Sequence, residues 1–450
     1  MNNQNKEKMG VKFATLIGII IFLMIPLILI KDLIDERSQM QQQVKREIAK
    51  SSSDEQRLIG PFLYIEFERE VELQNETKVI KDKAFVLPET LKIHSKLDTF
   101  EKYRSIYKAT LYRSINTISG EFSVAHLHAL RAEQVVSASL VFGIEDIRGI
   151  GLDSILKVSG QEVDILPGSL LNSIQEGVHA PISVSQLANE TLTFSADLHL
   201  QGMTRLSVSP LGSETHLSMS ANWPHPSFEG EYLPLSSEIS GESFTARWQA
   251  SYFSTNMQSI FTNCVMRSQC QMLYSRTMGV ALVDPVDHYL KSHRAINYAL
   301  LVILLVMASF FLLELVRSEP IHPVQYGFVG LALAIFYLLL ISLSEHLGFG
   351  AAYLISTLSA TGLLGWYVTG ILKSLKLGLY FSAGLIMLYS LLYSMLGAED
   401  YALLMGSLMC FMVLSLVMIL TRKVNWYGHA RSQQSASEAT TNIKNQSPAT

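Results

Sequence analysis

The sequence predicts a multi-pass membrane protein with six transmembrane α-helices, one N-terminal and five C-terminal, and a large β-rich domain inserted between helices 1 and 2. Three observations predict this fold class. Of the 450 residues, 49% are hydrophobic and only 16% are charged, whereas about 25% of the residues of a soluble domain are charged. Six apolar runs are each long enough to cross a hydrocarbon core of ~30 Å. Between the first two runs, apolar and polar residues alternate with a period of two. A purely soluble protein is therefore excluded.

The first apolar run, residues 11–30, predicts an uncleaved membrane anchor after a short segment at 1–10. Lys6 and Lys8 precede it and Lys12 lies at its start, and the charged stretch KDLIDE follows it without the small-residue cleavage site of a secretory signal peptide. Residues 31–50 keep apolar side chains near helical spacing among charges. We therefore expect the helix to continue beyond the membrane as a stalk.

Five further runs predict the C-terminal helices. They occupy residues 296–316, 326–344, 349–371, 377–396 and 401–420. Their links are too short to recross a bilayer, so consecutive helices must be antiparallel. The polar tail at 421–450 has nothing to bury and is expected to be disordered.

The distribution of lysine and arginine predicts the orientation of the helices. These residues gather beside one set of helix ends, including both termini, and are absent from the opposite short loops at 344–348 and 397–400. Because cytoplasmic loops carry the excess of Lys and Arg, both termini are expected in the cytoplasm. The segment 31–295 is then expected on the outer side.

Alternation of apolar and polar residues predicts the strands of this outer segment. Residues 192–200 and 244–250 alternate strictly, which buries one face of an antiparallel strand. Stretches at 60–67, 106–118, 135–144 and 203–209 also favour strands. We expect a twisted β-sandwich.

Ionisable residues lie only near the ends of the predicted spans. Glu314 has Arg317 three residues further on, so the two are either a snorkelling surface pair or include a functional carboxylate. Glu345 and His346 lie at the outer end of the third span, where an interfacial role is the simplest interpretation. The charge-free span centres argue against ion-coupled transport but not against lipid handling.

The search for a catalytic or metal-binding set finds none that is complete. Ser154 and Lys157 fit the S-x-x-K pattern, but its companion K-T-G is absent from the outer segment. No motif predicts a metal site or a cofactor, and the net charge of −4 argues against a nucleic-acid partner. Cys264 and Cys270 either close a small disulfide loop or remain thiols.

The most distinctive outer stretch is a candidate interaction loop. It comprises Trp223, Pro224, His225, Pro226, Ser227 and Phe228. Its two prolines fix φ and cannot donate ladder hydrogen bonds. The loop is either pinned into the β core by its aromatic residues or exposed for recognition, with His225 at its tip.

At these residues the chain resembles the CreD family of bacterial inner-membrane proteins, which are described as cell-envelope integrity proteins. The matching motifs are WPHPSFEGEYLP at 223–234, FGIEDIRGI at 142–150, HPVQY at 322–326 and FYLLLISLSEH at 336–346. The resemblance extends from the first helix to residue 427. It implies an inner-membrane location, a periplasmic 31–295 segment, and a role in envelope integrity and stress response under a two-component system. No catalytic residue is implied.

Three functional hypotheses follow from the residues and the resemblance. The first is a non-enzymatic periplasmic domain, anchored in the lipid bilayer, that contacts an envelope component or a membrane protein. The second is a transporter or lipid-handling protein that uses the helical bundle. The third is a periplasmic hydrolase, for which Ser154 and His225 are the weak candidates.

The predicted topology can be tested with alkaline phosphatase, which is active only outside the cytoplasm. Fusions placed after Glu399 and within residues 31–295 should both be active, because both segments are predicted to lie outside. A fusion after Arg422 should be inactive. An inactive fusion at Glu399 beside an active one in 31–295 would contradict the six-span topology.

Overall fold

The computed structural model describes residues 3–397, except 74–75, 126–134, 285–286 and 318–320, together with scattered positions between 404 and 422. The chain divides into two compact units. The helical unit comprises Met1–Met40 and Val286–Thr450, and the β unit comprises Gln41–Pro285. The first helix, α1 (Asn3–Ser51), continues across the boundary between them, through the predicted stalk.

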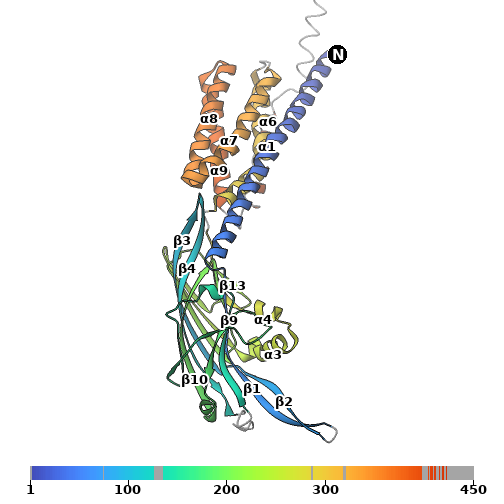
Figure 1. Ribbon diagram of the computed structural model, residues 1–450. Coiled ribbons are helices and arrows are strands. Elements are labelled where there is room, and N and C mark those ends of the chain that lie inside the picture. Colours follow the sequence, from blue (N-terminus) through green and yellow to red (C-terminus); the bar gives the residue numbers. More distant parts are fainter. Residues whose placement is uncertain are drawn as a thin grey trace, which may run out of the picture. The chain divides into compact units, whose positions relative to one another are not determined.

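The β unit is built from two eight-stranded sheets among the described residues (Figure 1). Sheet A has the order β13-β16-β11-β1-β5-β9-β8, with β2 paired to β1, and sheet B has the order β14-β15-β12-β3-β4-β10-β6-β7. The strands of sheet A are β1 (Gln56–Leu73), β2 (Glu76–Val86), β5 (Val135–Ile144), β8 (Leu166–Pro167), β9 (Gly177–Ile182), β11 (Arg205–Ser209), β13 (Pro226–Gly230) and β16 (Met278–Leu282). Those of sheet B are β3 (Thr90–Arg104), β4 (Tyr107–Ser123), β6 (Ile155–Val158), β7 (Gln161–Val163), β10 (Thr191–Met203), β12 (Glu214–Ala221), β14 (Ser236–Ile239) and β15 (Phe244–Ser251).

The two sheets differ in how their strands are buried, and the sequence explains the difference. In β10 and β15 of sheet B, buried and exposed residues alternate, which confirms the predicted pattern. In β5 and β16 of sheet A, consecutive residues are buried. A strand is buried continuously only when both faces of its sheet are covered.

Helices cover the outer face of sheet A. They are α3 (Met257–Arg267) and α4 (Gln271–Ser275). The short helix α2 (Tyr252–Thr255) follows β15, and two short 3-10 turns, η3 (Ile147–Gly149) and η4 (Val184–Ala188), link strands elsewhere. Figure 1 shows α3 and α4 beside β1. Phe261 of α3 packs against Phe62 of β1, with ring centroids 4.8 Å apart. A disulfide joins Cys264 and Cys270 in this layer.

The main hydrophobic core lies between the two sheets. It takes inward side chains from both, including Phe142 of sheet A and Phe122 and Trp248 of sheet B. Sheet A thus packs on both faces, whereas the outward side chains of β3, β10 and β15 are left at the surface.

The helical unit contains α5 (His288–Asn297), α6 (Ala299–Arg317), α7 (Pro323–Leu347), α8 (Phe349–Leu372) and α9 (Leu375–Gly397) besides the start of α1. Four helices of the described part are long and apolar enough to cross a membrane: α1, α7, α8 and α9. A fifth is obtained if α5 and α6, which are bent by 44° at a break, count as one span. The sixth predicted span, 401–420, lies largely outside the described residues, as does the tail at 421–450.

A break between α5 and α6 lies inside the span predicted at 296–316. Tyr298 ends α5, and α6 begins at Ala299. The two helices differ in pattern, because α5 is amphipathic and buries one face, including Tyr289 and Ile296, whereas α6 is mostly apolar. The segment predicted as outer to residue 295 therefore ends with a helix that belongs to the helical unit.

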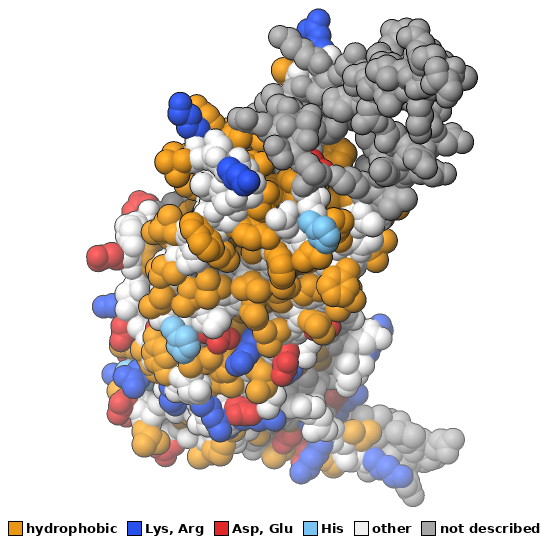
Figure 2. Space-filling model, turned by 90° about the horizontal axis from the view of Figure 1, so that it is seen from above, with side chains coloured by type: hydrophobic (Ala, Val, Ile, Leu, Met, Phe, Trp, Pro, Cys, Tyr) orange, Lys and Arg blue, Asp and Glu red, His pale blue; other side chains and the backbone are white. Residues whose placement is uncertain are grey.

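Large apolar side chains remain exposed on these helices. Trp366 of α8 is 77% exposed and Met387 of α9 is 74% exposed. Hydrophobic side chains cover much of the face that Figure 2 shows. Surfaces of this kind are stable in lipid and unfavourable in water.

Helix packing at Gly330 of α7 gives a testable prediction. A Cβ atom there would lie 2.1 Å from Leu23 Cδ1 of α1 and 2.7 Å from Met307 Cε of α6, whereas Gly327 meets no described atom within 4 Å. Gly330→Leu should overpack this contact and destabilise the protein by about 1–3 kcal/mol. Gly327→Leu is the matched control. Thermal unfolding of the detergent-solubilised protein should separate the two variants, and equal melting temperatures would contradict the packing.

Candidate functional site

A groove of about 910 Å³ lies on sheet B and is lined by side chains from five neighbouring strands. One row crosses the sheet through cross-strand partners: Thr245 of β15, Ser220 of β12, Lys96 of β3, Ile115 of β4 and His199 of β10. Four steps between strands of about 4.8 Å make this row roughly 19 Å long. A second row lies two residues away from the first on each strand. In this row Arg113 of β4 pairs with Asp98 of β3 and with Gln201 of β10.

Contacts within the groove leave several polar groups available. The Asn222 amide donates to Asp98 Oδ1 at 3.1 Å. The Arg113 guanidinium lies over the Phe100 ring, 5.0 Å from its centroid, an arrangement that leaves its edge free to donate. No ion pair to Lys96 occurs among the described residues. The groove therefore presents one central ammonium group among hydroxyl and amide groups.

One wall of the groove is the segment that follows β5. Arg148, Gly149, Ile150, Gly151 and Asp153 line this side. The Gly151 N–H donates to the His199 carbonyl at 2.7 Å, and the Ser154 hydroxyl accepts from the His199 N–H at 3.1 Å. Backbone bonds thus fasten the wall to β10.

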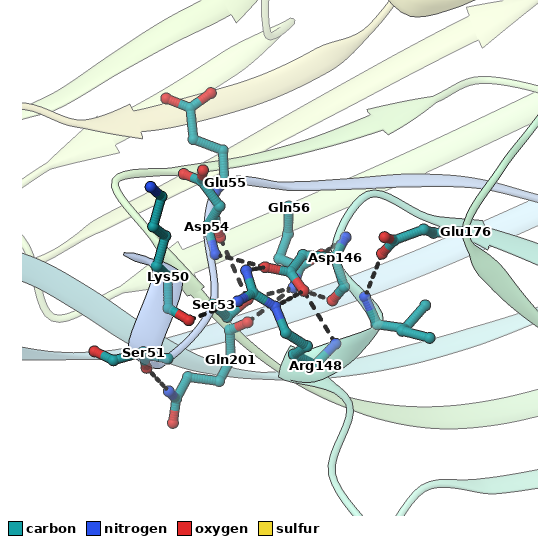
Figure 3. A network of polar contacts seen from close by, with 12 residues as sticks. Lys50, Ser51, Ser53, Asp54, Glu55, Gln56, Asp146, Arg148, Glu176 and Gln201 are labelled. Carbon is teal, nitrogen blue, oxygen red and sulfur yellow. Dashed lines mark hydrogen bonds and ion pairs between the residues drawn. The ribbon is translucent and has the colours of Figure 1, made fainter. Parts of the chain in front are cut away.

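A buried polar network holds the same wall against the end of α1 (Figure 3). The amide nitrogen of Gln56, at the start of β1, donates at 2.9 Å to Ser53 Oγ and to the carbonyls of Asp146 and Gln201. In return, Gln56 Oε1 accepts from the Asp146 N–H at 3.3 Å. The side chain of Gln201 donates to Ser52. Because Gln56 is only 1% exposed, these bonds are shielded from competing water.

Asp146 and Arg148 form the charged part of the network. Arg148 Nη2 and Nε donate to the Asp146 carboxylate at 2.6 and 2.9 Å, and Arg148 Nη1 donates to the Lys50 carbonyl in the last turn of α1 at 2.7 Å. Burial alone would raise the pKa of Asp146, but hydrogen bonds from Arg148 and from the Asp54 and Arg148 N–H groups outweigh it and hold this pKa below its usual value. A cation at a helix C-terminus also stabilises the helix dipole.

Gly149 lets the wall approach the network closely. A Cβ atom at this position would lie 2.2 Å from the Gln201 carbonyl oxygen and 2.5 Å from Gln56 Nε2. Both neighbours are held in hydrogen bonds and have no room to shift. Glycine is therefore required here.

The predicted loop at 223–228 is wrong in part. Pro226 begins β13, a strand at the edge of sheet A that pairs with β16, and Pro226 lies opposite Leu282. Proline is tolerated at the first residue of an edge strand, where a missing N–H costs little. Trp223 Nε1 donates to the Val283 carbonyl at 3.0 Å, and Phe228 packs edge-on against Trp248.

The two predicted alternatives for this loop each describe a part of it. Its aromatic ends are pinned into the β core, and its tip is exposed. Trp223 and Phe228 pack against the main core as partly buried residues. His225 is exposed, and Pro224 and Ser227 are half-buried. None of the six residues lines the groove on sheet B.

Glu314 is buried and is not the snorkelling surface residue that its spacing to Arg317 predicts. It is 9% exposed, and its carboxylate accepts from the Ile321 N–H at 3.2 Å and the Tyr326 hydroxyl at 2.8 Å. The chain folds back after α6, so α7 supplies partners that sequence spacing does not reveal. The side chain of Arg317 lies outside the described residues.

Glu345 and His346 differ in their surroundings. Glu345 accepts from the Tyr289 hydroxyl at 3.1 Å and lies 3.8 Å from Arg37 Nε, whereas His346 is exposed. These contacts join three helices of the helical unit. An interfacial role for the two residues stays a prediction.

The S-x-x-K stretch does not open a helix. Ser154 lies in a turn and donates to the Gly151 carbonyl at 2.8 Å, and Lys157 lies in β6. Among the residues that the structure describes, no three His, Cys, Asp or Glu side chains cluster closely enough to hold a metal ion.

The groove residues were missed because their proximity depends on strand pairing. Lys96 and His199 belong to no motif, and Ser220, which with Ala221 and Asn222 fits the S-x-N pattern, is far from both in the sequence. Strict alternation in 192–200 and 244–250 could have indicated which residues face outward, but the order and register of eight strands could not be read from it.

Comparison with known proteins gives the same family from two sequence searches. A family model described as "Inner membrane protein CreD" matches residues 8–427. Inner membrane protein CreD of Escherichia coli strain K12 is 33% identical over 436 residues, which cover 96% of each chain. Among solved structures, an M1 zinc metallopeptidase from Deinococcus radiodurans shows 9% identity and a TM-score of 0.18, over 36% of this chain and 39% of its own. That likeness says nothing about the fold or chemistry of this chain.

The network predicts a specific acid sensitivity. Because the pKa of Asp146 is lowered in the folded protein, its stabilisation is present above the unfolded pKa of ~3.9 and is lost as the pH falls through the lower folded value. Asp146→Asn should cost about 2 kcal/mol at neutral pH, because hydrogen bonds to a charged group are lost. It should also flatten the fall in melting temperature below pH ~4.

Tryptophan fluorescence of the solubilised full-length protein follows this unfolding, since Trp248 lies in the core of the β unit. Asp164→Asn, at an exposed position, is the control and should unfold like the parent protein. Identical melting curves for Asp146→Asn and the parent at every pH would contradict the role of the network.

Proposed function

Because the chain belongs to the CreD family of inner membrane proteins, we propose that it supports cell-envelope integrity and the response to envelope stress, with its β unit as a non-enzymatic interaction domain. The observation that carries this proposal is the groove on the exposed face of sheet B. The proposed partner is an envelope component or another membrane protein that binds in this groove.

The proposed topology places the β unit in the periplasm. It has six spans and cytoplasmic termini, because Lys and Arg gather beside one set of helix ends. The four or five apolar helices of the described part support a multi-pass anchor. In this arrangement the groove faces the compartment that contains the envelope polymers.

The form of the groove favours binding over catalysis. Its polar side chains are spread along two rows across five strands and do not converge on one point. The nearby Ser154 hydroxyl is engaged with backbone groups. Catalysis by acyl transfer needs a nucleophile within hydrogen-bond reach of a base.

The proposal predicts that charge reversal in the groove abolishes function in cells. In a strain that lacks the chromosomal gene, the double variant Lys96→Glu with Arg113→Glu should leave the envelope as permeable to detergent as the deletion does. Reversing these two charges should repel the partner of the groove. Sensitivity to detergent in plating assays measures the effect, and immunoblots of the membrane fraction verify equal expression.

The matched control reverses two exposed charges outside the groove, Lys81 of β2 and Arg267 of α3. This double variant should restore the barrier. Full restoration by the groove variant would overturn the proposal. If Glu314→Gln alone abolished restoration, the function would lie in the helical unit, as the transporter or lipid-handling alternative requires.

A further inference from the structure

The strands beneath the groove cannot recruit a peptide through its backbone. β15, β12, β3, β4 and β10 each have a neighbour on both sides, and the residues of the first row have a backbone or hydroxyl partner on each side. Strand addition needs a free sheet edge. Recognition in the groove must therefore come from side chains.

These side chains are mostly uncharged hydrogen-bonding groups. Thr245 and Ser220 supply hydroxyls and His199 supplies an imidazole, whereas the Asn222 amide already bonds to Asp98 and to the Thr99 N–H, and the Gln201 amide donates to Ser52. The hydroxyls and the imidazole can each donate and accept. Ile115 is the large apolar side chain exposed in the row, at 47%, so the groove offers no deep apolar pocket. Its chemistry matches a ligand covered with hydroxyl groups.

The charges define the ligand further. Lys96 lies at the centre of the first row with no ion pair among the described residues, and Arg113 lies beside it in the second. Asp98 and Asp153 also line the groove, and they would repel a ligand with a charge on every unit. Widely spaced negative charges can lie on Lys96 and Arg113, with Asp98 as the cross-strand neighbour of Arg113.

We propose that the groove binds an acidic glycan, that is, a chain of sugars that carries carboxylates at intervals. Lys96 donates to a carboxylate, Arg113 donates from the edge that Phe100 leaves free, and the hydroxyl and imidazole groups bind the sugar hydroxyls along the roughly 19 Å of the row. This inference rests on the proposed function and names the ligand class of the same groove.

The test uses the full-length protein in nanodiscs and three polysaccharides, with affinity measured by calorimetry at an ionic strength of about 0.15 M. Hyaluronan oligosaccharide has a carboxylate on every second sugar, dextran is neutral, and heparin is densely charged. Hyaluronan should bind more tightly than both. Lys96→Gln should weaken its binding about tenfold, which corresponds to ~1.4 kcal/mol.

Lys92→Gln is the matched control, because Lys92 is exposed on the same strand and face but does not line the groove. It should bind hyaluronan like the parent protein. Equal weakening of hyaluronan binding by both variants would indicate nonspecific electrostatic attraction. Tightest binding of heparin would indicate that the groove prefers a densely charged polyanion. Equal binding of dextran and hyaluronan would show that the groove does not recognise the carboxylates. Each of these results, or no binding of hyaluronan, would overturn the inference.

Failure of this inference is distinguishable from failure of the proposed function. If no polysaccharide binds but the groove double variant still fails to restore the barrier in cells, the ligand class is wrong and the function stands. If hyaluronan binding depends on Lys96 but the double variant restores the barrier fully, the function is wrong and the binding site stands.

Discussion

The hydrogen bonds of the buried Gln56 carboxamide fix the geometry on which the β unit depends. They join the turn after α1, the segment that follows β5, and β10, which are separated by up to 145 residues in the sequence. Arg148 extends the same network to the last turn of α1 through the Lys50 carbonyl. A buried network of this kind tolerates little rearrangement, because each unpaired group would keep its desolvation cost. The end of α1, the start of β1 and one wall of the groove are therefore positioned together.

The chain leaves the β unit after Pro285. Hydrogen bonds also hold the segment just before this point. Trp223 donates to the Val283 carbonyl, and the Val283 N–H donates to the His225 carbonyl at 3.3 Å. β1 starts and β16 ends at the same end of sheet A, because β1 is parallel to β11 and β16 is antiparallel to it. Two of the motifs that carry the family resemblance, at 142–150 and 223–234, thus hold the segments where the chain enters and leaves the β unit.

Patterns that depend on local chemistry could be predicted from the sequence. Alternation placed β10 and β15 and the direction of their side chains, since the period of a strand is two. Uniform apolarity indicated the helices α7, α8 and α9 by composition. The break at Tyr298 and the strand at Pro226 were missed, because an amphipathic turn before an apolar helix and an edge position in a sheet depend on neighbouring elements.

The sequence by itself determined that this protein has apolar helices long enough for a membrane and which residues of β10 and β15 face outward, because burial against lipid or a core selects residues by polarity alone. Only the tertiary structure decided which outward residues meet. The row from Thr245 through Lys96 to His199 exists because β15, β12, β3, β4 and β10 pair in one order and one register. A shift of one residue in any strand would turn its groove residue into the core. Likewise, Glu314 is buried because α7 folds back to supply the Tyr326 hydroxyl, a contact set by the packing of two helices and by nothing in either helix alone.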